Sequence, residues 1–496
     1  MKDLAAVALD AATSGGAEYA DIRISRHREQ SLYSREEKLK SVADTESTGF
    51  GVRVLLDGAW GFAASHRVAR DDVAAAAGRA LDMARANRRA VRRPVRLVPV
   101  PAVTDTWRSP VAKDPFGVSV AEKAELLLAV NAAALAVPGA QFCTSFLLLK
   151  REHKAFASTD GSWIEQDITR TWPCFTVTAV ASEGGQFESC KGDPFPRGIG
   201  YEHVEDAGLV KLAPVVAEKA VAKLHARSVE PGRRDLVLHP SNLWLTIHES
   251  VGHPTELDRA CGHEANYAGT SFLTPDKLGS LQFGSPVVNL VADKTIPGGL
   301  ATCGYDDDGV KTRRWHLVRD GLFVDYQTVR EQVAWPEYQE ARTRAGFPRP
   351  TESGAACYAD SWASFPFQRN VNIHLEPGPQ PLSPEELIAD TEEGIYIEGE
   401  SSYSIDHQRY NFQFSGQTFH EIKGGKLGEM LKDVAYQANT QDFWRSCDAI
   451  CDRRFWEMGG TYTCGKGQPP QSAPCSHGAA PARFRNVNVL NTRREV

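Results

Sequence analysis

Several features that would assign a protein to a common class are absent from this chain of 496 residues. None of its ten cysteines forms a C-x-x-C pair, which argues against a structural zinc site made of four cysteines. No stretch approaches the roughly 18 consecutive apolar residues of a membrane span, and Asp3 and Asp10 interrupt any signal-like run at the start. The net charge of −7 gives no general attraction to nucleic acid. We therefore expect a cytoplasmic protein with reduced cysteines that binds neither membrane nor nucleic acid.

The composition, with 42% hydrophobic and 24% charged residues, is ordinary for a globular protein long enough for two domains. Turn-forming residues at 229–233 separate two patterned segments. We therefore predict an α+β fold, with an N-terminal mixed α/β domain over residues 1–228 and a C-terminal domain over residues 229–496. In the first domain, apolar spacing predicts helices near residues 1–17, 69–89, 119–136 and 203–226, and strands near residues 19–26, 29–34, 47–56, 59–65 and 142–190.

The C-terminal domain is predicted to be rich in strands. The pairs Asp320-Gly321 and Gly424-Gly425 lie between alternating segments and indicate hairpins, as Asp57-Gly58 does in the first domain. Repeated hairpins predict an extended or barrel-like antiparallel sheet that carries the active site. Residues 306–309 contain three aspartates before a glycine, and they favour a tight turn over a cation site.

The pattern H-E-x-x-x-H at residues 248–253 places two histidines around a carboxylate. Histidines supply neutral nitrogen ligands to zinc, and a glutamate beside the first ligand can take a proton from the metal-bound water. A lone histidine on an apolar helical stripe is more often a core residue. The complete pattern instead favours a metal site formed by His248 and His253, with Glu249 as the general base.

This pattern has one more residue between glutamate and histidine than the H-E-x-x-H of metalloproteases. On a regular helix, residues five apart point roughly 140° away from each other, whereas residues four apart differ by roughly 40°. We therefore predict a π-bulge, or a helix end, between the two histidines, with the distortion at Gly252. Because Pro254 disfavours the α conformation at the preceding residue, the helix is predicted to stop at His253.

Two histidines do not hold a catalytic zinc firmly, so a third protein ligand is expected. Cys464 is the best local candidate, because it lies in a short strand that runs into a glycine turn. Cys475 and His477 form a competing pair. Glu256 and Asp258 are candidates to orient a ligand histidine through hydrogen bonds.

Several of these segments together resemble the TldD/PmbA family of peptidases, on the TldD side. The resemblance covers nearly the whole chain, and its segments are residues 248–253, Glu256, residues 269–271, 306–309 and 464–466, and, in the first domain, residues 19–23, 49–53 and 57–62. It implies that His248, His253 and Cys464 bind the metal and that Glu249 is the catalytic base. The chain departs from the family at Pro254 and in a longer, proline-containing tail after Cys464.

The resemblance further implies a cytoplasmic metallopeptidase that receives unfolded peptides in a chamber between two subunits, where a peptide adds to a sheet as a strand. The TldE/PmbA branch lacks the metal pattern and serves as a partner, so the expected assembly is a homodimer or a heterodimer with such a subunit.

The leading hypothesis is therefore a peptidase with one zinc per chain, acting on unfolded proteins or small peptides. Two alternatives stay open: a non-catalytic or regulatory subunit with a structural metal, and a zinc amidohydrolase of a small non-peptide amide. An intact Glu249 argues against the first alternative. The sequence identifies no group beyond the metal that would stabilise an oxyanion.

Overall fold

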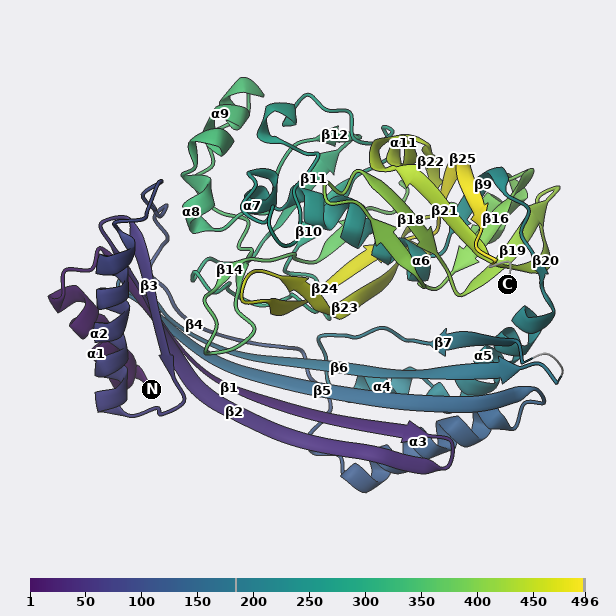
Figure 1. The fold of residues 1–496 in the computed structure, drawn as a ribbon, viewed down its shortest axis with the longest axis horizontal. Helices are drawn as coiled ribbons and strands as arrows, with labels where there is room; N and C mark the ends of the chain where they lie inside the picture. The colour runs from purple at the N-terminus through teal and green to yellow at the C-terminus, as the bar shows by residue number, and fades with distance from the viewer. Residues whose placement is uncertain (183–184, 494–496) are drawn as a thin grey trace.

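A long, curved sheet formed by the first part of the chain runs beneath the rest of the molecule (Figure 1). The computed structural model describes residues 1–182 and 185–493. The sheet has the strand order β3-β2-β1-β5-β6-β4, and β7 pairs with β6. Its strands are β1 (Tyr19–Arg35), β2 (Lys38–Leu56), β3 (Ala59–Ser65), β4 (Thr104–Arg108), β5 (Ala140–Ser158), β6 (Trp163–Val180) and β7 (Phe187–Gly192).

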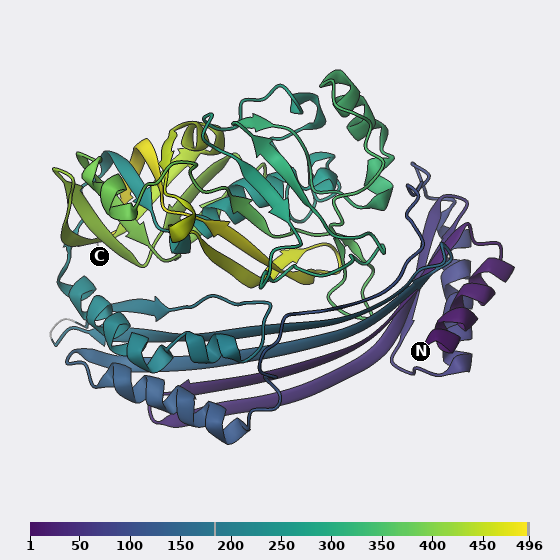
Figure 2. The ribbon, with the colours of Figure 1, turned by 180° about the vertical axis from the view of Figure 1, so that it is seen from behind.

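Helices cover one end and the outer face of this sheet. Figure 2 shows helices packed at one end of the sheet, and others along the face turned away from the rest of the chain. The helices are α1 (Lys2–Ser14), α2 (Arg70–Asn87), α3 (Val120–Leu135), α4 (Glu202–Asp206) and α5 (Leu209–His225). The first three confirm the predicted helices. The predicted helix at 203–226 is divided, because Gly208 adopts a left-handed conformation (φ 56°) between α4 and α5.

The strands of the first part are longer than predicted. β1 is one strand of 17 residues where two short strands were predicted, and β2 begins at Lys38 rather than near residue 47. Residues 38–48 are exposed, so no apolar alternation marks them as a strand. They are held by the ladder with β1 and by cross-strand ion pairs such as Arg28–Asp44 at 2.9 Å.

The rest of the chain forms two large mixed sheets and a two-stranded sheet. The strands are β8 (Arg227–Ser228), β9 (Gly232–Leu238), β10 (Leu290–Asp293), β11 (Arg314–Arg319), β12 (Leu322–Phe323), β13 (Cys357–Tyr358), β14 (Phe367–Gln368), β15 (Ile373–Leu375), β16 (Glu393–Glu398), β17 (Tyr403–Ile405), β18 (Asn411–Ser415), β19 (Thr418–Lys423), β20 (Lys426–Lys432), β21 (Val434–Asn439), β22 (Cys447–Ile450), β23 (Glu457–Lys466), β24 (Gln471–Ala479) and β25 (Ala482–Asn491). The helices are α6 (Pro240–Ile247), α7 (Leu257–Ala260), α8 (Arg330–Val333), α9 (Pro336–Arg344), α10 (Pro384–Ala389) and α11 (Thr440–Arg445).

The two large sheets of this part are open. The six-stranded sheet has the order β12-β11-β10-β15-β24-β23, and the ten-stranded sheet runs from β17 to β8 as β17-β18-β21-β25-β9-β16-β19-β20-β8, with β22 paired to β25. The extended arrangement is therefore confirmed, and the barrel-like alternative is wrong for the described strands. The pairing is also not purely antiparallel, because β9–β16 and β15–β24 are parallel.

The three predicted hairpins are confirmed. Asp57 and Gly58 connect β2 to β3 with φ values of 49° and 71°. Positive φ at both central residues is what a type I′ turn requires. The Asp320-Gly321 and Gly424-Gly425 pairs likewise have positive φ at both residues, and they connect β11 to β12 and β19 to β20.

The predicted turn at residues 306–309 is confirmed, and it also docks the curved sheet onto the rest of the chain. Gly309 has a φ of 75°, and Asp306 Oδ1 accepts the backbone N–H of Asp308 and Val310. The next two carboxylates pair with buried cations of the curved sheet: Asp307 with Lys154 at 2.7 Å, and Asp308 with Arg53 at 2.8 Å.

Sheet membership changes at the predicted domain boundary. Strands β1 to β7 share one sheet, and β8 onward belong to the others. The exact division at residue 228 stays a prediction. Within the described ranges, no helix is long and apolar enough to cross a membrane.

Replacing Gly61 of β3 by alanine is expected to destabilise the protein. A Cβ atom at Gly61 would lie 1.9 Å from the carbonyl oxygen of Ala80, which is backbone of the packed helix α2. The helix must shift, so Gly61→Ala should lower the free energy of unfolding by about 1–3 kcal/mol. Urea unfolding followed by fluorescence measures this change.

Gly78→Ala, in α2 itself, is the matched control. Nothing lies within 4 Å of its added Cβ, so the change should stabilise the helix by up to about 1 kcal/mol. Equal effects of the two substitutions would contradict the packing argument.

Candidate metal centre

The helix that carries the two histidines changes its hydrogen-bond pattern where they begin. Helix α6 ends at Ile247, and residues His248–Gly252 form a π-helical turn in which the N–H of His253 donates to the carbonyl oxygen of His248. In a π-helical turn, each backbone N–H bonds to the carbonyl oxygen five residues earlier, so residues five apart lie on the same side of the helix. His248 and His253 are five residues apart. Their ring centroids lie 4.6 Å apart. The predicted π-bulge is confirmed, and it brings His248 and His253 to one side of the helix.

Gly252 is required at the end of this turn. A Cβ atom there would lie 2.4 Å from Asn370 Nδ2, so no larger residue fits beside the asparagine. The predicted stop at His253 is wrong. His253 is helical (φ −63°, ψ −43°), and a 3₁₀ turn His253–Thr255 follows. Pro254 fits this turn because a residue near the start of a helix needs no N–H partner.

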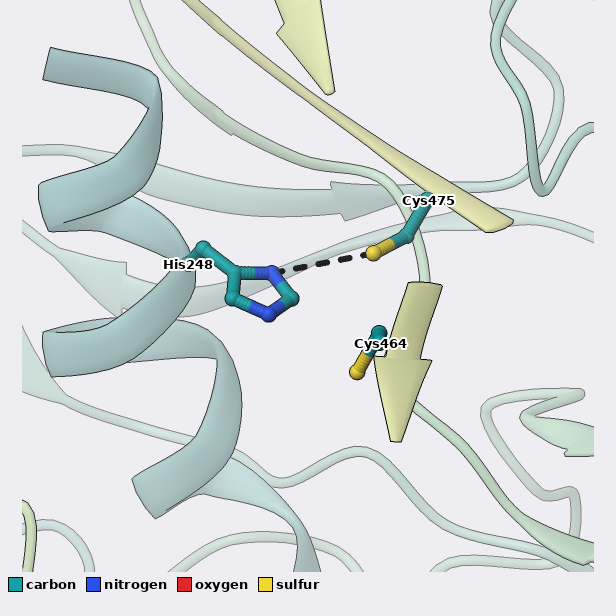
Figure 3. A group of neighbouring side chains, drawn as sticks. All are labelled: His248, Cys464 and Cys475. Atoms are coloured by element: carbon teal, nitrogen blue, oxygen red, sulfur yellow. Dashed lines mark hydrogen bonds between the residues drawn. The ribbon is translucent and has the colours of Figure 1, made fainter. Parts of the chain in front are cut away.

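The late cysteine lies against the histidines. Cys464 is on β23, and its Sγ is 3.8 Å from His253 Nε2. Cys475, on the neighbouring strand β24, is also present, with Sγ 3.6 Å from His248 Nδ1. Figure 3 shows both sulfur atoms turned toward the His248 ring. The structure therefore brings the predicted residues together and keeps the competing cysteine beside them.

These donor atoms could hold one metal ion. One atom from each of His248, Cys464 and Cys475 lies within 4.8 Å of the others, and the same is true of His248, Glu249 and His253. Tetrahedral zinc with bonds of about 2.0–2.3 Å separates its nitrogen and sulfur ligands by about 3.5 Å. The Cys464–His253 distance of 3.8 Å is close to that value.

Hydrogen bonds set which ring nitrogen of each histidine is free. His253 Nδ1 lies 3.1 Å from Glu256 Oε2, so it carries the proton and Nε2 faces Cys464. His477 Nδ1 donates to the Ile373 carbonyl oxygen, which leaves His477 Nε2 as an acceptor. His248 Nδ1 lies 2.7 Å from that acceptor and donates to it. Both His248 and His253 therefore keep a lone pair on Nε2.

The pKa values of the two cysteines are shifted in opposite directions. A hydrogen bond from Cys475, supported by His253 and His248, holds the pKa of the Cys464 thiol well below its ordinary value. Burial and the neighbouring Cys464 raise the pKa of Cys475 well above its ordinary value. The thiolate is the form that binds metal, so the directions of these shifts favour Cys464 over Cys475 as a candidate ligand.

Glu256 is held by two buried cations. Arg259 Nε donates to its Oε2 at 2.8 Å, and Lys466 Nζ lies 3.3 Å from its Oε1. Burial alone would raise the pKa of Glu256, but Lys466 and Arg259 hold it far below its ordinary value. Glu256 thus orients His253 as predicted. Asp258 does not contact a histidine and instead accepts from Lys466 at 2.8 Å.

Sequence reasoning missed the contacts that three residues make in this cluster. Lys466 could have been found, because it lies two residues after Cys464 and so on the same face of β23. His477 was considered only as a ligand. Arg409 Nη1 donates to Glu249 Oε2 at 3.1 Å from a position 160 residues away, and no local pattern marks it.

Three family models match the chain. Residues 20–84 match PmbA/TldA metallopeptidase domain 1, residues 113–227 the central domain, and residues 231–490 the C-terminal domain. The chain belongs to the PmbA/TldA metallopeptidase family. It is a metallopeptidase, as the resemblance of its sequence implied.

Similar proteins span nearly the same length. A metalloprotease of Methanothermobacter thermautotrophicus is 30% identical over 480 residues, which are 96% of each chain. A zinc metalloprotease TldD homolog of Saccharolobus solfataricus is 22% identical over 86% of this chain and 87% of its own. The solved structure of TldE from Thermococcus kodakarensis has a TM-score of 0.70 at 15% identity, covering 97% of this chain and 98% of TldE, and it shows the shared fold.

Removing the acceptor that orients His248 is expected to weaken metal binding. His477→Leu leaves His248 Nδ1–H without its partner, and loss of such an orienting group typically costs 10–100-fold in metal affinity. Competition against a chromophoric zinc chelator measures the affinity. His316→Leu, at a partly buried histidine of β11, is the control and should leave it unchanged. Equal affinities in the folded variants would contradict the assignment.

Proposed function

We propose that this chain is a zinc-dependent peptidase that hydrolyses unfolded proteins or small peptides, with Glu249 as the general base. One observation carries the proposal: two imidazoles and the sulfur atom of Cys464 gather beside a buried carboxylate. His248, His253 and Cys464 would hold the zinc, and the fourth coordination position would take water or substrate. A relative named as a zinc metalloprotease, together with the nitrogen and sulfur donors of the cluster, supports zinc as the metal. We propose one ion per chain.

When bound, the zinc would lower the pKa of a coordinated water toward neutrality and polarise the scissile carbonyl. The chain supplies the proton transfers. Glu249 Oε2 accepts from Arg409, and Oε1 accepts no hydrogen bond from a described residue. Oε1 is therefore the atom proposed to take the water proton and to return it to the departing amine. The carboxylate side chain is only 6% exposed, which strengthens its interactions by excluding water.

The sheet edges beside the site support an unfolded substrate. Among the described strands, β23, which carries Cys464, pairs with β24 alone, and β17 pairs with β18 alone. An extended peptide can add to such an edge through its main chain, so binding depends little on sequence. Strand addition requires a backbone that is not already paired, which an unfolded chain offers and a folded protein does not.

The expected partner is a second subunit of the same fold. TldE of Thermococcus kodakarensis has this fold, which supports a heterodimer with a TldE/PmbA-like chain, and a homodimer is the other arrangement. All ten cysteines are free thiols, and a thiolate ligand must stay reduced. These thiols support a cytoplasmic location.

Loss of a ligand is expected to remove the metal and activity together. His248→Ala and Cys464→Ala should lose most of the roughly one zinc per chain expected in wild type, because two remaining ligands hold zinc weakly. Metal analysis by mass spectrometry and cleavage of a fluorogenic peptide on the same samples test this. Cys261→Ala, at a cysteine outside the cluster, should keep both. Full zinc in Cys464→Ala would remove that residue from the ligand set.

Glu249→Gln is expected to keep the metal and to lose turnover. The amide cannot take a proton, and loss of a general base typically costs about 10²–10⁴-fold in rate. Retained turnover in the zinc-loaded variant would exclude Glu249 as the base.

Substrate class separates the proposal from its alternatives. The protein, with a TldE-like subunit if it requires one, should cleave a denatured protein much faster than the same protein folded, because only the denatured chain can add as a strand. Electrophoresis of the products measures both rates. Hydrolysis confined to small non-peptide amides would favour an amidohydrolase, and zinc without hydrolysis would favour a structural metal.

A further inference from the structure

One cation touches the proposed base, and it comes from a distant turn. Arg409 Nη1 lies 3.1 Å from Glu249 Oε2, with the two side chains 16% and 6% exposed. Burying two charged side chains costs desolvation energy, and this cost can exceed the energy of attraction between them. Stability alone therefore does not explain why an arginine is held here.

The turn that presents Arg409 is strained and fixed in place. Arg409 has a φ of 62°, a left-handed conformation that costs a non-glycine residue of the order of 1 kcal/mol or more. Asp406 accepts the backbone N–H groups of Tyr410 and Asn411 at 2.8 and 3.0 Å. Thr440 Oγ1 donates to the Arg409 carbonyl oxygen at 2.8 Å. Strain that the surroundings enforce is typical of functional sites.

A second segment clamps the same turn. Thr270 N donates to the His407 carbonyl oxygen at 2.7 Å, and Phe272 N donates to that of Gln408 at 2.9 Å. Gly269, with a φ of 88°, permits this approach, because a Cβ atom there would lie 2.3 Å from the His407 oxygen. Two elements thus fix the guanidinium against Glu249.

The guanidinium has donors to spare. Nη1 donates to Glu249 and Nη2 donates to the Ala268 carbonyl oxygen at 3.3 Å. A guanidinium carries five N–H groups and stays protonated at any working pH. Nε is buried and has no partner among the described residues. Fixed, charged donors beside a base are what a developing oxyanion needs.

A phenol lies near the same carboxylate. Tyr403, on the edge strand β17, is about half exposed, and the Glu249 carboxylate together with burial raises its pKa. An edge strand to which a peptide could add therefore lies close to Glu249 and Arg409.

We propose that Arg409 has two tasks in peptide hydrolysis: one N–H holds Glu249, and another donates to the scissile carbonyl oxygen as it becomes negative. The inference rests on the proposed function. The water oxygen bonds to the carbonyl carbon, the π electrons move to the carbonyl oxygen, and Glu249 takes the water proton. When the C–N bond breaks, these electrons re-form the carbonyl and the proton passes to the amine nitrogen. Arg409 stays charged throughout.

The alternative role for the same contact is a latch that neutralises Glu249 until substrate arrives. The two roles predict opposite effects of removing the charge. An oxyanion donor lowers kcat when it is lost, whereas loss of a latch leaves kcat unchanged or raises it.

The test compares Arg409→Met and Arg409→Lys with wild type, and with Arg344→Met at an exposed arginine of α9 as the matched control. Zinc content, kcat and KM for a fluorogenic peptide are measured on each. Affinity for a phosphinic peptide, which mimics the tetrahedral anion, is measured by calorimetry. Wild type supplies the reference for the proposed function itself.

We expect Arg409→Met to keep its zinc, to lose about 10²–10³-fold in kcat, and to change little in KM. Its affinity for the phosphinic peptide should fall in parallel, Arg409→Lys should lie between, and added guanidinium ion should restore part of the lost rate.

An unchanged or higher kcat would overturn the proposal in favour of the latch. Loss of zinc or of folding in Arg409→Met, without guanidinium rescue and with full activity in Arg409→Lys, would reduce Arg409 to a structural role and overturn it too. If wild type with a TldE-like subunit binds zinc but cleaves no peptide, the proposed function itself fails, and this inference fails with it.

Discussion

The spacing of the two histidines is the constraint on which the rest of the site depends. Residues 248 and 253 face one ion only if the helix between them is wound with five-residue hydrogen bonds. Such a turn is wider than an α-helical turn and needs support from its neighbours. Here it continues a helix buried in the main core, and Gly252 lets Asn370 pack directly against its backbone. The unusual pattern in the sequence and the unusual helix are thus the same feature.

Charge is arranged around the centre in distinct pairs. Glu256 is compensated by Lys466 and Arg259, and Glu249 by Arg409. For Glu256 these cations hold the pKa far below its ordinary value although the carboxylate is buried. The register of the parallel pair β15–β24, in which Ile373 lies opposite His477, places the imidazole that orients His248. Sheet pairing and electrostatics together determine which atoms face the metal position.

Sequence reasoning could predict what short stretches determine. The π-turn follows from the spacing of His248 and His253, the hairpins from paired turn residues, and the role of Glu256 from its nearness to His253. The exposed half of β2 could not be found, because polar residues on both faces leave no alternation. The opposite pKa shifts of Cys464 and Cys475 depend on the pairing of β23 with β24, and the contact of Arg409 with Glu249 depends on a fold that joins residues 160 apart. Pro254 was misjudged because a 3₁₀ turn tolerates proline where an α-helix does not.

The strand order of the ten-stranded sheet also decides when the cluster around the histidines can form. β25 is the last strand of the described chain, yet it lies in the interior of the sheet between β21 and β9, and β9 leads directly into the histidine helix. The preceding strand, β24, brings Cys475 and His477. Because chains are synthesised from the N-terminus, the histidine helix is made long before β23 and β24, which carry the two cysteines and His477. The cluster of possible metal ligands can therefore form only after these late strands have paired beside the helix.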